Sequence, residues 1–409
     1  MNANIVGAAM TPFGRHPDAD LRSLAEAASA ATLRDAGISA HDVQMVVFGN
    51  ATDGVLHGQE MIRGEVALRH AGFAGVPIIN VENACASSSS AFHVACLAVQ
   101  AGAVDVALAL GVEKLTHPVK ARSFAAVATA VDLAGEPELR RVVASSLLGS
   151  QEPAEREVNS SPLMALYADK ARAYMDRSGA TDEHLAQISV KNRRHAGLNP
   201  NAQFQTPVTI DEVLASRVIA APLRLLMCAP IGDGAAGVLV ASSEYARRLG
   251  GRHVRVEACA LTSNGAHPAA GHPAERAGRT AYEQAGLGPM DVDVAEVHDA
   301  CSAAELWMYE ALGFCGAGDG PKLLADGTTE LGGRLPVNTS GGLLSRGHPL
   351  GATGCGQLVE LTDQLRRRAG VRQVPEARVA LAQNAGGMLD HGDEAVSVVT
   401  ILSRPTGGS

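Results

Sequence analysis

The order of apolar and polar positions along the chain predicts αβ units, and one such unit occurs twice. An amphipathic helix ends at Ala36-Gly37, and the β-branched strand Val46-Val47-Phe48 follows after a turn through an aspartate. The same succession returns in the second half with Ala285-Gly286 and Val294-Ala295-Glu296-Val297, at one constant offset. This repetition predicts two halves with a common fold.

A second pair of strands supports the duplication. Val106-Ala107-Leu108-Ala109 in the first half resembles Val379-Ala380-Leu381-Ala382 in the second. Short apolar runs that alternate with helices are typical of parallel sheets covered by helices on both faces. Two such halves packed together predict an α/β fold in an α/β/α/β/α layered body.

Between the halves the pattern changes. Longer polar helices are predicted at Ala165–Met175 and Asp182–His195, followed by a turn at Asn199-Pro200. We interpret this stretch as an inserted lobe. The predicted parts are an N-terminal half at 1–118 that is completed by about 220–250, an inserted loop domain at 119–219, and a C-terminal half at 251–409.

Composition and charge exclude several classes of protein. The 409 residues carry a net charge of −9, and no basic run interleaved with aromatic residues occurs, so nucleic acid is not an expected partner. There is no leader-like N-terminus and no charge-free apolar stretch of about 18 residues, so we expect no membrane span and a cytoplasmic location. The seven cysteines form no C-x-x-C pair, so no metal is expected.

The first candidate for chemistry is Cys85. It stands between a short, mainly apolar strand, Ile78–Val81, and a helix of small residues that runs to Gln100. A thiol at a helix N-terminus has a lowered pKa, because the helix dipole and the free N–H groups favour the thiolate. The alternative is a small buried residue at a helix start, which is the usual fate of a cysteine.

Three further stretches carry polar residues at strand ends or in glycine-rich turns. His348 lies in Gly347-His348-Pro349-Leu350-Gly351, which lacks the spacing of a P-loop or of a dinucleotide fingerprint. His298 ends the strand that begins at Val294, where it could face a ligand or be a satisfied core residue. Gln383-Asn384-Ala385-Gly386-Gly387 ends another strand and alone predicts only a turn.

Taken in this order, the motifs Asn-x-Cys, His-Asp, Gly-His-Pro and Asn-x-Gly-Gly resemble those of the thiolase superfamily, specifically the sterol carrier protein 2 type thiolases. The resemblance covers nearly the whole chain and includes Lys191-Asn192 and Cys228-Ala229-Pro230. It implies the thiolase fold, with duplicated βαβαβαββ halves and an inserted loop domain. It also implies coenzyme A thioesters as substrates and a homodimer or homotetramer.

The same resemblance implies roles for individual residues. Cys85 would attack an acyl-CoA thioester and carry the acyl group, and His348 would take the thiol proton. His298 would help to form an oxyanion hole for the thioester enolate, together with backbone N–H groups near Gly387. The pantetheine arm of CoA would lie beside the surface formed by roughly 160–262.

The chain departs from the pattern at the residue that moves a proton at the substrate α-carbon. The subfamily has a cysteine where this chain has Ala300, and other thiolases have one at the position of Asn384. Three accounts are open: Cys301 reaches the site through a bent loop, His298 and His348 suffice, or another acyl transfer is performed. We favour the second. His391, in a polar stretch after Gly387, lies either in a solvated turn or at the cleft.

The main functional hypothesis is therefore an acyl-CoA C-acyltransferase that forms or cleaves a 3-ketoacyl-CoA through an acyl-Cys85 intermediate. One alternative is an acyltransferase or retro-aldol subunit of the same fold that acts on a non-CoA or steroid-type substrate. Another is a non-catalytic partner that binds acyl-CoA or lipid. The acyl chain and the direction of the reaction cannot be read from the sequence.

Overall fold

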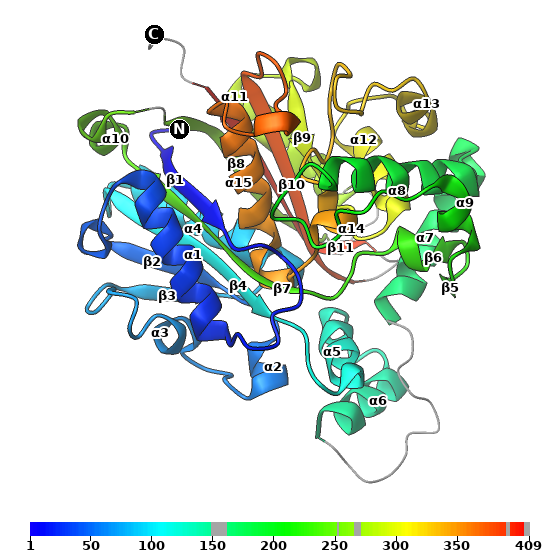
Figure 1. Ribbon diagram of the computed structural model, residues 1–409, viewed down its shortest axis with the longest axis horizontal. Helices are drawn as coiled ribbons and strands as arrows, with labels where there is room; N and C mark the ends of the chain where they lie inside the picture. The colour runs from blue at the N-terminus through cyan, green and yellow to red at the C-terminus, as the bar shows by residue number, and fades with distance from the viewer. Residues whose placement is uncertain (149–161, 252, 266–270, 390–392, 405–409) are drawn as a thin grey trace.

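The computed structural model describes residues 1–148, 162–251, 253–265, 271–389 and 393–404 (Figure 1). His391 lies outside these residues. The strands are β1 (Asn4–Met10), β2 (Met45–Gly49), β3 (Ile78–Val81), β4 (Val106–Lys114), β5 (Val218–Ala220), β6 (Leu223–Arg224), β7 (Asp233–Ala241), β8 (Val254–Ser263), β9 (Val294–Glu296), β10 (Val379–Met388) and β11 (Glu394–Ser403).

The α-helices alternate with these strands in both halves. They are α1 (Leu21–Ala36), α2 (Asp53–His57), α3 (Arg63–Ala67), α4 (Ser87–Gln100), α5 (Lys120–Val127), α6 (Pro137–Leu148), α7 (Pro162–Ser178), α8 (Asp182–Ala196), α9 (Ile210–Ala215), α10 (Ser243–Leu249), α11 (Pro273–Ala285), α12 (Ser302–Ala311), α13 (Gly320–Ala325), α14 (Gly342–Arg346) and α15 (Thr353–Leu365).

Nine strands form one mixed sheet in the order β3-β2-β4-β7-β1-β8-β11-β10-β9. The two halves meet where β1 pairs with β8 over only two residues, Asn4 with Arg255 and Ile5 with Val254. The expectation of parallel sheets was wrong, because only β3-β2-β4 and β9-β10 are parallel. The strands of the αβ units run parallel, whereas β10 pairs antiparallel with β11, β8 with β11, and β7 with both β1 and β4.

The duplication predicted from the sequence is confirmed in detail. Helices α1 and α11 both end at a glycine in the left-handed region, Gly37 at φ +69° and Gly286 at φ +65°. A short 3₁₀ helix follows in each half, at Ala40–Asp42 and Pro289–Asp291, and the strands β2 and β9 come next. Each strand has a parallel neighbour, so the two units are equivalent in the sheet.

The expected layered α/β architecture is also confirmed. Helices α4 and α15 contact each other and pack between the halves, α4 on β2 and β4, and α15 on β7 and β10. Helix α1 packs on β1 and β7, and α11 packs on β8 and β11. Figure 1 shows α15 between α1 on one side and the lobe of α7 to α9 on the other. The buried start of α4 and the end of β10 therefore meet in the interior.

The chain between β4 and β7 contributes α5 to α9 and the two-stranded β5-β6 sheet. Figure 1 shows α5 and α6 extending below the layered body. None of these described elements joins the nine-stranded sheet, but the exact boundaries of the inserted domain stay a prediction. Among the described helices, none has the length and apolar character needed to cross a membrane.

Candidate active site

Cys85 lies in a tight turn between β3 and α4. The turn is a single stretch of 3₁₀ helix, and Ala84 within it has φ +47°, a conformation that residues with a side chain rarely adopt. Asn83 N–H donates to Ser87 Oγ over 3.0 Å, and its Nδ2 donates to Ser90 Oγ over 2.8 Å. The serine-rich start of α4 thus holds the strained turn in place and fixes the position of the thiol.

Strand β10 approaches this turn more closely than any side chain would allow. A Cβ atom added at Gly386 would lie 2.1 Å from the carbonyl oxygen of Asn83 and 2.8 Å from the backbone nitrogen of Ala86. The next residue, Gly387, has φ +64°. The two glycines, which alone predicted only a turn, therefore let the end of β10 reach the Cys85 thiol.

His348 contacts the thiol directly, and a second hydrogen bond fixes its tautomer. Its Nε2 lies 3.2 Å from Cys85 Sγ, and its Nδ1 lies 2.7 Å from Thr353 Oγ1. The single hydroxyl hydrogen of Thr353 is donated to the carbonyl oxygen of Pro349 over 2.9 Å. Nδ1 must therefore donate to Thr353, which leaves the lone pair of Nε2 to accept the hydrogen of the thiol.

His298 lies next to His348 in the same site. Its ring centroid lies 5.3 Å from that of His348, with the two planes at 80°. Asn384 Nδ2 donates to His298 Nδ1 over 3.0 Å, and because an amide nitrogen cannot accept, the hydrogen of neutral His298 lies on Nε2. Burial lowers the pKa of His298 to about 4, so the ring is a neutral N–H donor at physiological pH.

These side chains come from four separate stretches and converge within a small volume. The ligand-type atoms of Cys85, His298 and His348 lie within 4.8 Å of one another, a spacing that would also suit a three-ligand metal site. Here Sγ and Nε2 of His348 already hydrogen-bond to each other, so a proton lies between them.

The expected low pKa of Cys85 is not found. Burial raises the pKa of the thiol to about 12, and the negative charge of Glu113 adds to this effect. Hydrogen bonds from the backbone N–H groups of Cys85 itself and of Gly387 act in the opposite direction but are weaker. Burial also holds the pKa of His348 well below its usual range. The resting pair is therefore a neutral thiol and a neutral imidazole.

The account in which Cys301 reaches the site is wrong. Cys301 is completely buried in the core, where its backbone pairs with that of Cys228 in an isolated antiparallel bridge. The preceding residue, Ala300, faces the cavity instead. Neighbouring residues of an extended chain point to opposite sides, so the one-residue shift turns the thiol away. Asn384 carries no titrating proton, and its amide positions His298.

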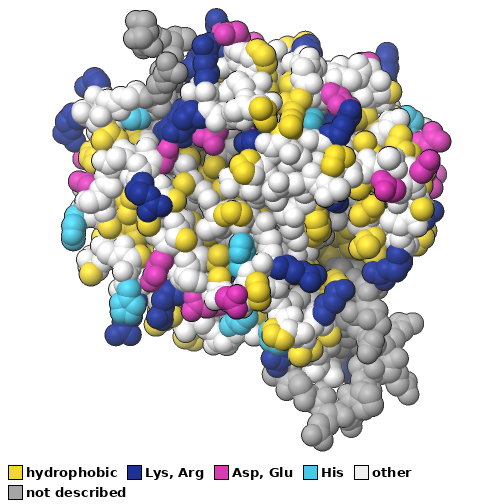
Figure 2. Space-filling view, in the orientation of Figure 1, with side chains coloured by type: hydrophobic (Ala, Val, Ile, Leu, Met, Phe, Trp, Pro, Cys, Tyr) yellow, Lys and Arg dark blue, Asp and Glu magenta, His cyan; other side chains and the backbone are white. Residues whose placement is uncertain are grey.

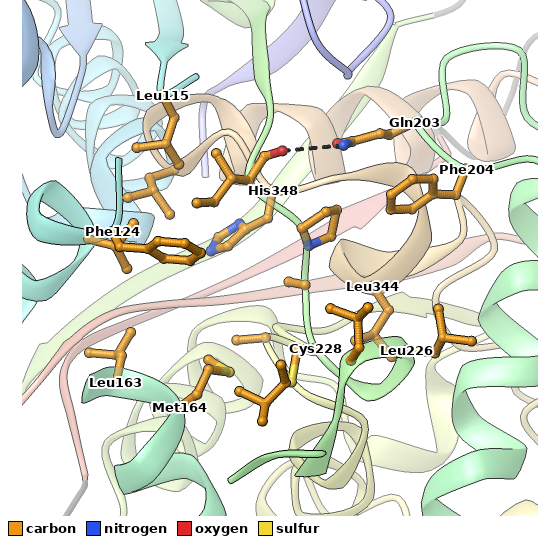
Figure 3. Close-up of a pocket in the computed structure, with 18 of the residues that line it drawn as sticks. Leu115, Phe124, Leu163, Met164, Gln203, Phe204, Leu226, Cys228, Leu344 and His348 are labelled. Carbon is orange, nitrogen blue, oxygen red and sulfur yellow. Dashed lines mark hydrogen bonds between the residues drawn. The ribbon is translucent and has the colours of Figure 1, made fainter. Parts of the chain in front are cut away.

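A cavity of about 580 Å³ opens beside Cys85 and His348. Figure 3 shows Gln203 and Phe204 on one side of it and Leu163 and Met164 on the opposite side. Most lining side chains are apolar, whereas four are cationic: Arg15, Lys120, Arg193 and Arg217. On the face shown in Figure 2, Lys and Arg side chains gather beside an apolar hollow near α5. The cavity can accept a ligand with an apolar part and an anionic part.

Two family models match the chain. The model for the thiolase N-terminal domain matches residues 3–244, and the model described as thiolase C-terminal domain-like matches residues 260–404. The chain belongs to the thiolase family. The resemblance inferred from the four motifs is thereby confirmed, and so is the thiolase fold.

Curated relatives of this thiolase-family chain cover nearly its whole length. It is 38% identical over 392 residues to an acetyl-CoA acetyltransferase of Methanothermobacter thermautotrophicus, which covers 94% of this chain and 96% of the relative. It is 37% identical to the benzoylsuccinyl-CoA thiolase subunit BbsB of Thauera aromatica, with 94% of each chain covered. It is also 37% identical to human sterol carrier protein 2, covering 93% of this chain and 69% of that protein.

A solved structure with the same fold is described as an aldolase and not as a thiolase. The chain from an "Ltp2-ChsH2(DUF35) aldolase" superposes with a TM-score of 0.78 at 25% identity, covering 100% of this chain and 99% of that one. The thiolase fold is therefore shared with a protein described as an aldolase, and fold alone does not decide the reaction.

Two residues that support the site in this thiolase-family chain were not singled out from the sequence. Thr353 orients His348, and its place five residues after the histidine, at the start of α15, was the available signal. Glu113 anchors the loop that carries His348, because its buried carboxylate accepts from Gly351 N–H over 2.8 Å and from Thr52 Oγ1 over 2.7 Å. Its signal was a carboxylate directly after the apolar run of β4.

Proposed function

We propose that the protein is an acyl-CoA C-acyltransferase that forms or cleaves a 3-ketoacyl-CoA through an acyl-Cys85 intermediate. The observation that carries this proposal is the chain of contacts from the Cys85 thiol through His348 to Thr353, at the wall of a ligand-sized cavity. The names of two relatives, an acetyltransferase and a thiolase subunit, agree with this reaction class.

In the first step, Cys85 Sγ attacks the substrate carbonyl while its hydrogen passes to Nε2 of His348. Because both groups are neutral at rest, the proton moves as the S–C bond forms and not beforehand. The backbone N–H groups of Cys85 and Gly387, which act on the sulfur, are suited to bind the oxyanion of this step. The Nε2–H of His298 is suited to bind the enolate oxygen of the second thioester.

The same cavity suits coenzyme A as the carrier. Its lining includes Arg193 and Arg217, whose guanidinium groups can pair with phosphates, and Phe204, which stacks under Arg193 at 4.7 Å. These residues fall within the stretch of roughly 160–262 that was expected to border the pantetheine. We therefore propose that the phosphates lie toward these cations and the thioester toward Cys85.

The test is intact-protein mass spectrometry after incubation with acetyl-CoA and a panel of longer acyl-CoAs. We expect the wild type to gain the mass of one acyl group, Cys85→Ala to gain none, and Cys315→Ala, which changes a cysteine outside the cavity, to behave as the wild type. An adduct that persists in Cys85→Ala would overturn the proposed nucleophile. No adduct with any thioester would favour the non-catalytic binding partner.

A retro-aldol reaction is the second candidate, because the structural neighbour is described as an aldolase and Ala300 supplies no proton donor. Retro-aldol cleavage needs no covalent acyl-enzyme. Cleavage of a 3-hydroxyacyl-CoA by the wild type, and by Cys85→Ala at the same rate, would support it. Absence of this cleavage in a wild type that cleaves a 3-ketoacyl-CoA would exclude it.

We also propose that copies of the chain pair through the edge strand β3, as a homodimer or a dimer of dimers. β3 forms one end of the nine-stranded sheet, and Ile79 on it is 39% exposed. An unpaired strand edge that presents an apolar side chain is a ready site for pairing. Light scattering coupled to size-exclusion chromatography should give at least twice the mass of one chain, and Ile79→Lys should lower it.

A further inference from the structure

Claisen chemistry requires a group that moves a proton at the thioester α-carbon, in addition to the base that activates Cys85. The account favoured from the sequence assigns this step to His298 and His348, and a third group beside the two histidines is the alternative. The following inference concerns this group and rests on the proposed function. Ala300 has no transferable proton, Cys301 is buried in the core, and Asn384 is an amide bonded to His298. Besides Cys85, the described lining of the cavity contains one other thiol, Cys228, and one phenol, Tyr167.

Cys228 is the weaker candidate. Its Sγ donates to the backbone oxygen of Arg224 over 3.3 Å, so its hydrogen is directed to the protein and not to the cavity. Burial raises its pKa to about 12. Figure 3 places Cys228 across the cavity from His348, which is the residue that contacts the nucleophile. These features indicate that Cys228 lines the cavity without supplying a proton to the substrate.

Tyr167 differs from Cys228 in having a free hydroxyl. The residue is only 4% exposed, yet no residue in the described part of the chain forms a hydrogen bond with its Oη. Among the described residues, the fully enclosed polar atoms without a partner do not include Tyr167 Oη, so this hydroxyl keeps some open space beside it. Because Tyr167 lines the cavity, that space is available to a group of a bound substrate.

The ring of Tyr167 is held rigidly. It stacks on Trp307 with centroids 6.3 Å apart and planes 8° from parallel, and Tyr174 packs edge-on against the same indole at 6.2 Å. On α7, Leu163, Met164 and Tyr167 all line the cavity, as positions i, i+1 and i+4 on one helical face. A hydroxyl fixed by stacking keeps its geometry during the reaction, as a catalytic group requires.

Electrostatics connect this hydroxyl to the nucleophile. Burial raises the pKa of Tyr167 well above its usual range. The charge of Glu394 raises it further, as do Cys85 and Cys301 in their ionised forms. The phenol therefore lies within electrostatic range of the Cys85 sulfur and stays protonated at neutral pH. Once deprotonated in the reaction, it would be a strong base in a dry site.

We propose that Tyr167 is the acid/base residue that moves the proton at the thioester α-carbon. In cleavage, attack by Cys85 breaks the Cα–Cβ bond and leaves its electron pair on the α-carbon as an enolate. The Tyr167 O–H bond breaks as the new C–H bond forms, which leaves a phenolate. The phenolate then takes the thiol proton of the incoming CoA, whose thiolate displaces the acyl group from Cys85, and His348 returns its proton to that sulfur. Formation of a 3-ketoacyl-CoA follows the same steps in the reverse order.

The variant Tyr167→Phe removes the hydroxyl and keeps the stacking on Trp307. The measured quantity is exchange of the α-hydrogens of acetyl-CoA with D₂O, followed by mass spectrometry and compared with the rate of Cys85 acylation. We expect exchange to fall about 100-fold or more, in line with the usual contribution of a general acid or base, while acylation stays at the wild-type rate. The matched control is Tyr174→Phe, on the same helix and the same indole but bonded to Glu310 at 2.6 Å outside the cavity.

Three outcomes would overturn the proposal. Exchange at the wild-type rate in Tyr167→Phe would show that the hydroxyl is not used. Equal losses of exchange and acylation in Tyr167→Phe, with Tyr174→Phe intact, would show a structural role. Loss of exchange in Cys228→Ala but not in Tyr167→Phe would identify the thiol instead. Failure of the proposed function is distinguishable, because the wild type would then form no Cys85 adduct.

Discussion

Replacing Thr353 by valine tests whether the tautomer of His348 controls the reactivity of Cys85. Valine keeps the shape of threonine but removes the oxygen that accepts the Nδ1 hydrogen over 2.7 Å. The imidazole must then either leave a buried N–H without a partner or move its hydrogen to Nε2, which would no longer accept from the thiol. A buried unsatisfied donor costs about 1–3 kcal/mol.

If that cost falls on the reactive tautomer, acylation of Cys85 should slow about 5- to 150-fold, at about 1.4 kcal/mol for each factor of ten. The assay is the rate of acyl adduct formation at a fixed acyl-CoA concentration, measured for the wild type, Thr353→Val and Thr353→Ser. Serine keeps the hydroxyl and should retain most of the rate. Acylation of Cys85 in Thr353→Val at the wild-type rate would refute the reasoning. So would an equal loss in Thr353→Ser, since the methyl group would then matter and not the hydrogen bond.

The rate of Cys85 alkylation by iodoacetamide should rise with pH from about pH 6 to about pH 10. The reason is that the thiolate forms only as the pH approaches the pKa of the thiol, which burial raises to about 12. An alkylation rate that reaches a plateau near neutral pH would contradict a neutral resting thiol. Gly386→Ala should lower both the acylation rate of Cys85 and the melting temperature, because the added Cβ would lie 2.1 Å from the backbone oxygen of Asn83. An unchanged melting temperature would show that β10 moves away from this oxygen without loss of stability. Lys191→Met should destabilise the protein by about 3–5 kcal/mol in urea titrations, because it leaves Glu305, 2.7 Å away and fully buried, without its cation. A change within about 0.5 kcal/mol, typical of a surface position, would show that this buried ion pair does not stabilise the fold.

The sequence identified the site through motifs whose residues are local to one another. Asn83 and Cys85 share one turn, and His348 shares a loop with its neighbouring glycines, so short-range spacing was enough to single them out. The repeated αβ unit likewise predicted the duplicated, layered fold, because helix and strand periods and glycine caps are local properties. What it missed in the fold was the mixed direction of the strands, since the antiparallel joins between β7, β1 and β8 bring together segments far apart in the chain.

The chain by itself therefore determined the family and the repeated architecture, and it singled out three residues of the candidate site, because each depends on residue type and short-range order. Only the tertiary structure decided the protonation of the pair, because burial and the charge of Glu113 raise the pKa of Cys85 above what a helix N-terminus would give. It also turned Cys301 into the core and brought Tyr167 from α7 to the cavity. Burial, and contacts between residues far apart in the chain, arise only when the halves and the inserted helices pack together.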